Sequence, residues 1–142
     1  MRTMVLPLLL TVLACCGVAR AQDYTYVGID EFKGWLEGNR SVHLVDIQPV
    51  MDFKKQHFAD SIQTNAYPVE SDEQRAALDQ GLAAFTKENR DVVIICPRGK
   101  MGAERAYDYL KSKGIPVNRL FILTGGMASW PYGDLLIKEG CG

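Results

Sequence analysis

The sequence predicts an α/β fold with a mainly parallel central sheet and helices on both of its faces. Short runs of β-branched and aliphatic residues alternate along the chain with segments in which apolar residues recur at helical spacing. Residues 91–96 form a run, apolar after its first residue, that is too short for a helix and is typical of a strand covered on both faces. The alternation favours parallel strands, because successive parallel strands are usually joined by helices.

Local patterns define the elements expected before this central strand. They are a helix over residues 29–37, a strand over 41–47, a helical turn within 49–58, a short strand over 62–66 and a helix over 71–88. The first helix carries Phe32, Trp35 and Leu36 on one face. In the last, Gly81 disfavours a single unbroken helix.

The second half of the chain continues the alternation. It is expected to contain a helix between residue 101 and Gly114, a strand over 120–123, and a final helix holding Met127 and Trp130. Apolar residues of the first of these helices recur at i, i+3, i+4 and i+7, so this helix should pack on the sheet. Pro131 is expected to end the final helix early.

The amino-terminal segment has the layout of a secretory signal peptide. Arg2 precedes an apolar run over residues 4–13, and small residues end at Ala21, where cleavage is expected. Residues 1–21 would then be the signal peptide and 22–142 a single domain in the periplasm or outside the cell, without a membrane span. The alternative is lipoprotein processing, which would leave the chain lipid-anchored through Cys15.

Charge and cysteine content narrow the function classes. Loss of two arginines with the signal peptide, from 16 basic and 17 acidic residues, leaves a formal net charge of −3, which disfavours nucleic acid as a partner. Cys96 and Cys141 would be the only cysteines of the mature chain, too few for a disulfide scaffold. Zinc-site and thioredoxin-like spacings are absent from the sequence, and neither a metal nor an organic cofactor is expected.

Cys96 is the residue that the sequence singles out for chemistry. It stands where the buried strand ends and a turn leads into a helix, the place at which open α/β sheets bind ligands. The turn consists of Pro97, Arg98, Gly99, Lys100 and Met101. Backbone N–H groups at the helix start and two side-chain charges should together favour the thiolate form of the cysteine.

Three segments in order resemble the rhodanese family of sulfurtransferases. The loop that starts at Cys96 matches the active loop of that family, residues 44–47 with Phe53 and His57 resemble its first strand, and Gly125-Gly126 with Trp130 resembles its closing element. The resemblance covers residues 26–137 and implies a rhodanese-like fold. It also implies that Cys96 takes a sulfane sulfur from a donor such as thiosulfate or polysulfide and passes it, as a persulfide, to a thiol, cyanide or protein acceptor. Residues 97–101 would bind the substrate.

The sequence also departs from related patterns. Gln48 stands where the rhodanese family commonly has arginine, so no ion pair with Asp46 is expected, and Asp46 should instead bond to backbone in the following turn. Phosphatases and arsenate reductases of related fold use Cys-x5-Arg, but Gly102 occupies the arginine position. Phosphoryl transfer is therefore disfavoured.

Two further points remain open in the sequence. The main rival to an enzyme is a module of the same fold that holds a sulfur species or a protein without turnover. Cys141 could resolve an oxidised Cys96, pair with another chain or stay exposed. His43 and His57 are expected to be structural.

Overall fold

The structure is a computed structural model that describes residues 23–139. The predicted signal peptide, the alternative lipid site at Cys15 and Cys141 lie outside these residues. The central sheet has five strands: β1 (Tyr26–Val27), β2 (Val42–Asp46), β4 (Ile62–Gln63), β5 (Asp91–Ile95) and β6 (Leu120–Leu123). Their order is β1-β6-β5-β2-β4, and every neighbouring pair is parallel. The prediction of a mainly parallel sheet is confirmed.

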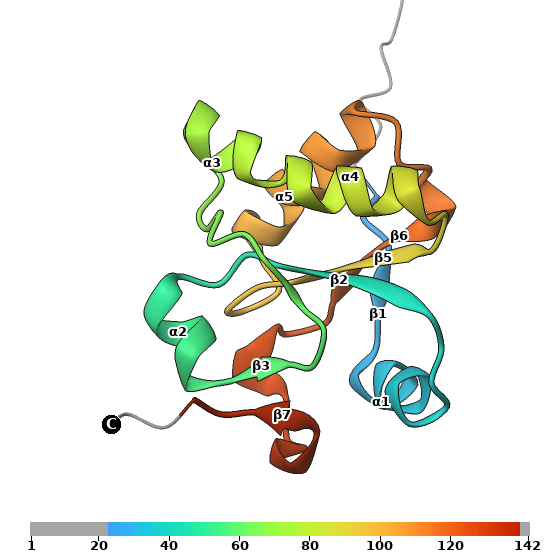
Figure 1. Cartoon of the computed structure of the whole chain (residues 1–142), viewed down its shortest axis with the longest axis vertical. Coiled ribbons are helices and arrows are strands. Elements are labelled where there is room, and N and C mark those ends of the chain that lie inside the picture. The colour runs from blue at the N-terminus through green and yellow to red at the C-terminus, as the bar shows by residue number, and fades with distance from the viewer. Residues whose placement is uncertain (1–22, 140–142) are drawn as a thin grey trace, which may run out of the picture.

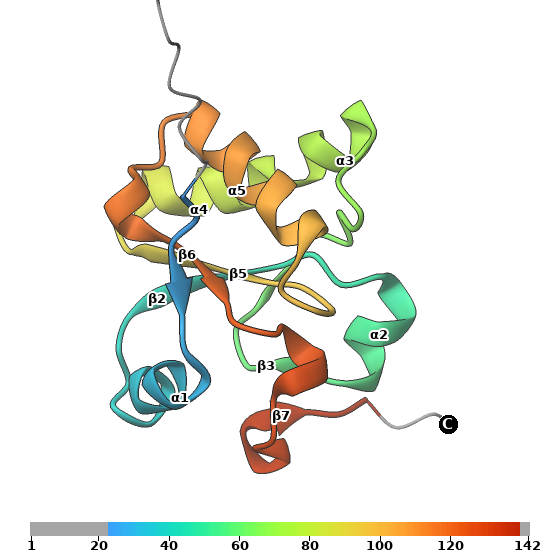
Figure 2. The same cartoon turned by 180° about the vertical axis from the view of Figure 1, so that it is seen from behind.

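Helices cover both faces of this sheet (Figures 1 and 2). The helices are α1 (Ile29–Glu37), α2 (Val50–Lys55), α3 (Asp72–Ala77), α4 (Asp79–Lys87) and α5 (Met101–Ser112). Three of them, α3, α4 and α5, lie together on one side of the sheet, while α1 and α2 lie on the other. A two-stranded antiparallel ribbon of β3 (His57–Phe58) and β7 (Leu136–Ile137) shares the second side.

The alternation of side chains along the strands divides the apolar core into two clusters. On the face of α3 to α5, Val45, Ile94 and Ile122 pack with Tyr107 and Leu110 of α5. On the other face, residues one position along the same strands pack with aromatic side chains: Leu44, Val93, Leu123, Phe32, Phe58 and Trp130. Because both faces are covered, β5 is buried along nearly its whole length, which is why its sequence is continuously apolar.

The segment expected as a helix over residues 71–88 contains two helices, and the break lies at Leu78. The N–H of Leu78 bonds to Arg75 O at 3.0 Å, which tightens the turn and lets the fully buried Leu78 side chain enter the core. Gly81 does not break the helix. A Cβ at Gly81 would lie 2.6 Å from Val45 Cγ2, so this glycine allows α4 to approach the sheet closely.

Two other elements are shorter than predicted. The strand expected over residues 62–66 ends at Gln63, because Asn65 adopts a left-handed conformation with φ 54°. The expected final helix is a single 3₁₀ turn over Met127–Ser129. Its first N–H groups bond to the loop after β5 instead of starting an α-helix, and Pro131 has no N–H to extend the turn.

Candidate active site

Cys96 lies in the turn between the central strand β5 and helix α5. Its Sγ accepts a hydrogen bond from Gly99 N at 2.7 Å, and the backbone N–H groups of Arg98 and Lys100 also interact with it. The turn therefore surrounds the sulfur with N–H donors, as the sequence predicts for the start of a helix. The Cys96 residue is only 2% exposed.

Burial has a second effect on this thiol that the sequence did not predict. It raises the pKa of Cys96 above the ordinary value, and the three N–H bonds lower the pKa without fully offsetting the burial. The charge on Asp46 raises it further. The N–H groups favour the thiolate, as the sequence predicts. The expectation is wrong for the combined effect of all surroundings on the pKa of Cys96, because a buried sulfur loses the stabilisation that water gives its anion.

Two glycines allow the loop and the segment after β6 to pack backbone against backbone: Gly99 lies in the loop and Gly126 follows β6. Gly99 and Gly126 have φ values of 66° and 59°, which L side chains rarely adopt. A Cβ at Gly126 would lie 2.3 Å from Cys96 O and 2.7 Å from the N atoms of Arg98 and Gly99. Met127 N and Ala128 N donate to the carbonyls of Cys96 and Pro97, each at 2.9 Å. The closing Gly-Gly element is therefore the backbone support of the loop.

A pocket of about 380 Å³ opens in front of the sulfur. It is lined by residues of the loop, of α5 and of the segment before α3: Cys96, Arg98, Lys100, Met101, Gly102, Arg105, Tyr67, Pro68 and Glu70. Arg105 Nη1 is already engaged, because it donates to Pro68 O and pairs with Glu70 Oε1, each at 3.2 Å. Arg98 and Lys100 form no ion pair within residues 23–139, so they supply the available positive charge.

The structure brings most of the predicted site residues together. Four of the six line this pocket, namely Cys96, Arg98, Lys100 and Met101, whereas Gly99 faces the supporting glycines. Pro97 lies on the far side of the loop, where a pocket of about 390 Å³ is shared with Arg98, Gln48 and α2. Sequence reasoning did not assign Tyr67, Pro68, Glu70 and Arg105 to the site, since Tyr67-Pro68 indicated only the end of a strand.

Gly102 lies at the position of the oxyanion-binding arginine in Cys-x5-Arg proteins. A Cβ at Gly102 would lie 2.8 Å from both Cδ2 and Cε2 of Tyr67. The aromatic ring therefore fills the space that a side chain at position 102 would need. Arg105, one turn later, cannot replace that arginine without leaving Glu70.

Asp46 and the two histidines make structural contacts. Asp46 Oδ1 accepts a hydrogen bond from Gln48 N at 2.9 Å, which is the bond to backbone that the sequence predicts. His57 Nδ1 lies 2.8 Å from Phe53 O, and its ring stacks on that of Phe53. His43 Nε2 lies 2.7 Å from Glu88 O.

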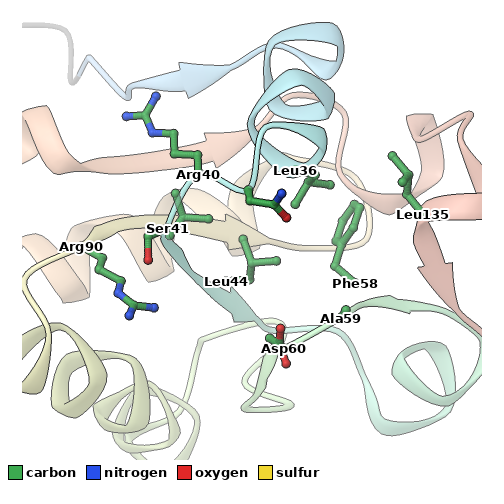
Figure 3. Close-up of a pocket in the computed structure, with 11 residues that line it drawn as sticks. Leu36, Arg40, Ser41, Leu44, Phe58, Ala59, Asp60, Arg90 and Leu135 are labelled. Carbon is green, nitrogen blue, oxygen red and sulfur yellow. The ribbon is translucent and has the colours of Figure 1, made fainter.

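A separate pocket of about 480 Å³ lies at the amino ends of β2 and β5, the opposite end of the sheet from Cys96 (Figure 3). Leu36, Leu44 and Phe58 border it, and no cysteine or histidine of the described residues lines it. The arginines at its rim are already paired, Arg40 with Asp91 and Arg90 with Glu88. Among the described residues that line this pocket there is therefore no thiol that could carry a sulfur atom.

Residues 23–139 contain no group of three metal-ligating side chains and no helix long and apolar enough to cross a membrane. The fold and the loop together define an α/β protein with a buried cysteine whose sulfur is surrounded by backbone N–H groups at the carboxyl edge of its sheet. The chain matches the family model of the rhodanese-like domain over residues 29–131 and belongs to that family. Among curated proteins, none is significantly similar in sequence.

Several solved structures share the fold. Ygr203w, described as a yeast protein tyrosine phosphatase of the rhodanese family, has a TM-score of 0.61 at 19% identity, with 80% of this chain and 90% of that chain covered. As-Sb reductase from Leishmania major has a TM-score of 0.61 at 21% identity, with 82% of this chain and 86% of that chain covered. Thiosulfate sulfurtransferase from Pseudomonas aeruginosa has a TM-score of 0.61 at 20% identity, with 83% of this chain but only 20% of that longer chain covered.

Proposed function

We propose that this protein is a sulfurtransferase that carries a sulfane sulfur on Cys96. The observation that supports this most directly is the cradle of N–H groups around Sγ, with Gly99 N at 2.7 Å, beside a pocket whose available charges are Arg98 and Lys100. Backbone N–H groups stabilise an anion without supplying a proton, which suits a thiolate and its persulfide. The donor would be thiosulfate or a polysulfide, both of which are anions.

The chemistry consists of two displacements at sulfur. The Cys96 thiolate attacks the outer sulfur of thiosulfate, a new S–S bond forms, and the old S–S bond breaks so that sulfite leaves with the electron pair. A small-molecule thiolate, cyanide or the thiolate of an acceptor protein then attacks the outer sulfur of the persulfide, and the Cys96 thiolate leaves. The protein returns to its starting oxidation state after the second step, and the loop is ready for the next donor.

Phosphatase and reductase activities of the kind named for two structural neighbours are less well supported. Those chemistries use an arginine to hold an oxyanion. In this chain Gly102 occupies the corresponding position, the Tyr67 ring fills the space beside it, and Arg105 is paired with Glu70.

One observation favours a second candidate function, a module that binds sulfur or a protein partner without turnover. Cys96 is almost fully buried and burial raises its pKa, so the free protein holds mainly the thiol at neutral pH. An enzyme would need donor binding to favour the thiolate. Arg98 and Lys100 are placed to do this, because both line the pocket that an anionic donor would enter.

Mass spectrometry after incubation with thiosulfate or polysulfide separates the two functions. The mature protein should gain the mass of one sulfur atom, and cyanide should remove it with formation of thiocyanate. Cys96→Ser should abolish the gain, whereas Cys141→Ser serves as the matched cysteine control and should keep it. Loading without multiple turnovers would indicate the binding module, and loading of Cys96→Ser would exclude the proposed site.

We also propose that the protein acts outside the cytoplasm. The support is the order of Arg2, an apolar run and Ala21 in the amino-terminal segment. In that location a low-molecular-weight thiol or a secreted protein would be the acceptor.

A further inference from the structure

Glu70 carries the only carboxylate among the described residues that line the pocket in front of Cys96. Three cationic side chains line the same pocket: Arg98, Lys100 and Arg105. An anionic donor is attracted by these cations and repelled by the carboxylate. Glu70 therefore lowers the positive charge that the pocket offers to an anion.

Glu70 reaches the pocket from the segment between β4 and α3, which lies beside the amino end of α5 (Figures 1 and 2). Its Oε1 lies 3.2 Å from Arg105 Nη1, and the same nitrogen donates to Pro68 O at 3.2 Å. Arg105 is thus tied to this segment at two points. The side chains of Arg105 and Glu70 are 35% and 63% exposed, so solvent screens the pair and its effect on anion binding should be moderate.

The backbone that carries Glu70 is held by its neighbours. Glu70 N donates to Gln74 Oε1 at 2.7 Å, and Glu70 O accepts from Arg75 Nη1 at 3.1 Å. The preceding residue, Val69, has a φ of 63°, which β-branched residues rarely adopt, and its side chain is buried in the core. Burial of Val69 and these hydrogen bonds therefore fix the position from which Glu70 pairs with Arg105.

The ion pair removes one of the three cations from the set that can bind an anion. The two loop cations, Arg98 and Lys100, have no ion-pair partner within residues 23–139. Arg105 has the planar guanidinium group that suits two oxygen atoms of a tetrahedral oxyanion, but Glu70 already engages it. A dianion in the pocket therefore meets two available cations and one carboxylate.

We propose that Glu70 is a specificity-determining residue: by pairing with Arg105 it lowers the affinity of the Cys96 pocket for doubly charged oxyanions relative to singly charged anions. The role rests on the proposed function, since it decides which sulfur donors reach Cys96. Thiosulfate is a dianion, whereas hydropolysulfide and organic persulfide ions carry a single charge. Repulsion by one carboxylate grows with the charge of the ligand, so Glu70 favours the singly charged donors.

Protection of Cys96 from iodoacetamide measures anion binding at this pocket without any sulfur transfer. Sulfate and perchlorate are the probes, because both are tetrahedral, neither can donate a sulfane sulfur, and they carry two charges and one charge. Alkylation is followed by mass spectrometry on the peptide that contains Cys96, so that the other cysteines do not contribute. Ionic strength is held constant, because salt screens exposed charges.

Glu70→Gln should strengthen protection by sulfate about three- to tenfold and protection by perchlorate less than about threefold. The double variant Glu70→Gln/Arg105→Gln has the net pocket charge of the unsubstituted protein, so sulfate protection should return to within about twofold of the original value. Glu73→Gln is the matched control. Glu73 lies in the first turn of α3 and does not line the pocket, so this variant should change sulfate protection by less than about twofold.

Three results would overturn the role of Glu70: unchanged sulfate protection in folded Glu70→Gln, equal gains for sulfate and perchlorate, or a gain that persists in the double variant. In sulfur transfer, Glu70→Gln should raise kcat/KM for thiosulfate more than for hydropolysulfide. A protein that shows the shift in sulfate protection but never transfers sulfur would refute the proposed function and leave the role of Glu70 intact. Sulfur transfer without any shift in protection would refute the role of Glu70 alone.

Discussion

Replacing Gly126 by alanine should displace the backbone of the Cys96 loop without changing any side chain that lines the pocket. Gly126 has φ 59° and ψ −157°, a conformation that is essentially restricted to glycine and costs an L residue about 1–3 kcal/mol. The added Cβ would also lie 2.3 Å from Cys96 O and 2.7 Å from Arg98 N and Gly99 N. All three are backbone atoms, so no rotation of a side chain can relieve the contact and the loop itself must move.

The expected size of the effect follows from the bonds that such a movement breaks. A hydrogen bond to a charged group is worth about 1.5–3 kcal/mol, so losing the bond from Gly99 N should raise the pKa of Cys96 by about one to two units. The thiolate fraction at neutral pH, and with it the alkylation rate, should fall roughly 10- to 100-fold. Sulfur loading from thiosulfate should fall in parallel.

Gly114→Ala is the matched control for this substitution. Gly114 has a φ of 109°, and a methyl group added there would meet no other described atom within 4 Å, so alanine carries backbone strain without a collision. Thermal unfolding should show a loss of stability of about 1–2 kcal/mol and alkylation should stay at the unsubstituted rate. If Gly126→Ala is folded and alkylated as fast as Gly114→Ala, the role given to the Gly-Gly support is wrong.

The remaining predictions concern charge and processing. Arg98→Ala and Lys100→Ala should each lower kcat/KM for thiosulfate about five- to 100-fold and for polysulfide less, and equal losses for both donors would show that these charges do not select the donor. Burial raises the pKa of Asp46 from 3.8 to about 6. Because the folded protein then binds this proton more tightly than the unfolded chain, the free energy of unfolding should fall by up to about 3 kcal/mol as the pH rises through that range. Asp46→Asn should therefore gain stability relative to the unsubstituted protein at pH 8 but not at pH 4, and urea unfolding at both values checks this. Amino-terminal sequencing of protein from a bacterial periplasm should begin at Gln22, and recovery of the full-length chain there would contradict cleavage.

The sequence predicted best those elements in which many consecutive residues show an apolar run or apolar residues at helical spacing. Residues 91–96 and the helical spacing of α5 predicted the central strand and its covering helix, and the structure confirms both. Two-residue strands such as β1 and β3 were not predicted, because two residues are too few to show alternation. Their formation depends on partners far along the chain, β6 for β1 and β7 for β3.

The site shows the same division between local and distant information. The loop from Cys96 to Met101 is contiguous, so its residue types alone indicated an anion cradle. The wall formed by Tyr67 and Glu70 comes from a much earlier segment, and only the fold brings it to the sulfur. The rise in the pKa of Cys96 was likewise missed, because burial depends on everything packed around the loop.

The contact between Tyr67 and Gly102 limits how this chain could change its chemistry in evolution. Installing an arginine at position 102 alone would collide with the aromatic ring, and shortening Tyr67 alone would open space at the site without any gain in anion binding. Tyr67 is 40% exposed, so its ring has solvent on one side into which it could turn to admit a longer side chain at position 102. An activity that depends on such an arginine therefore needs a displacement or a replacement of Tyr67 as well as the new residue.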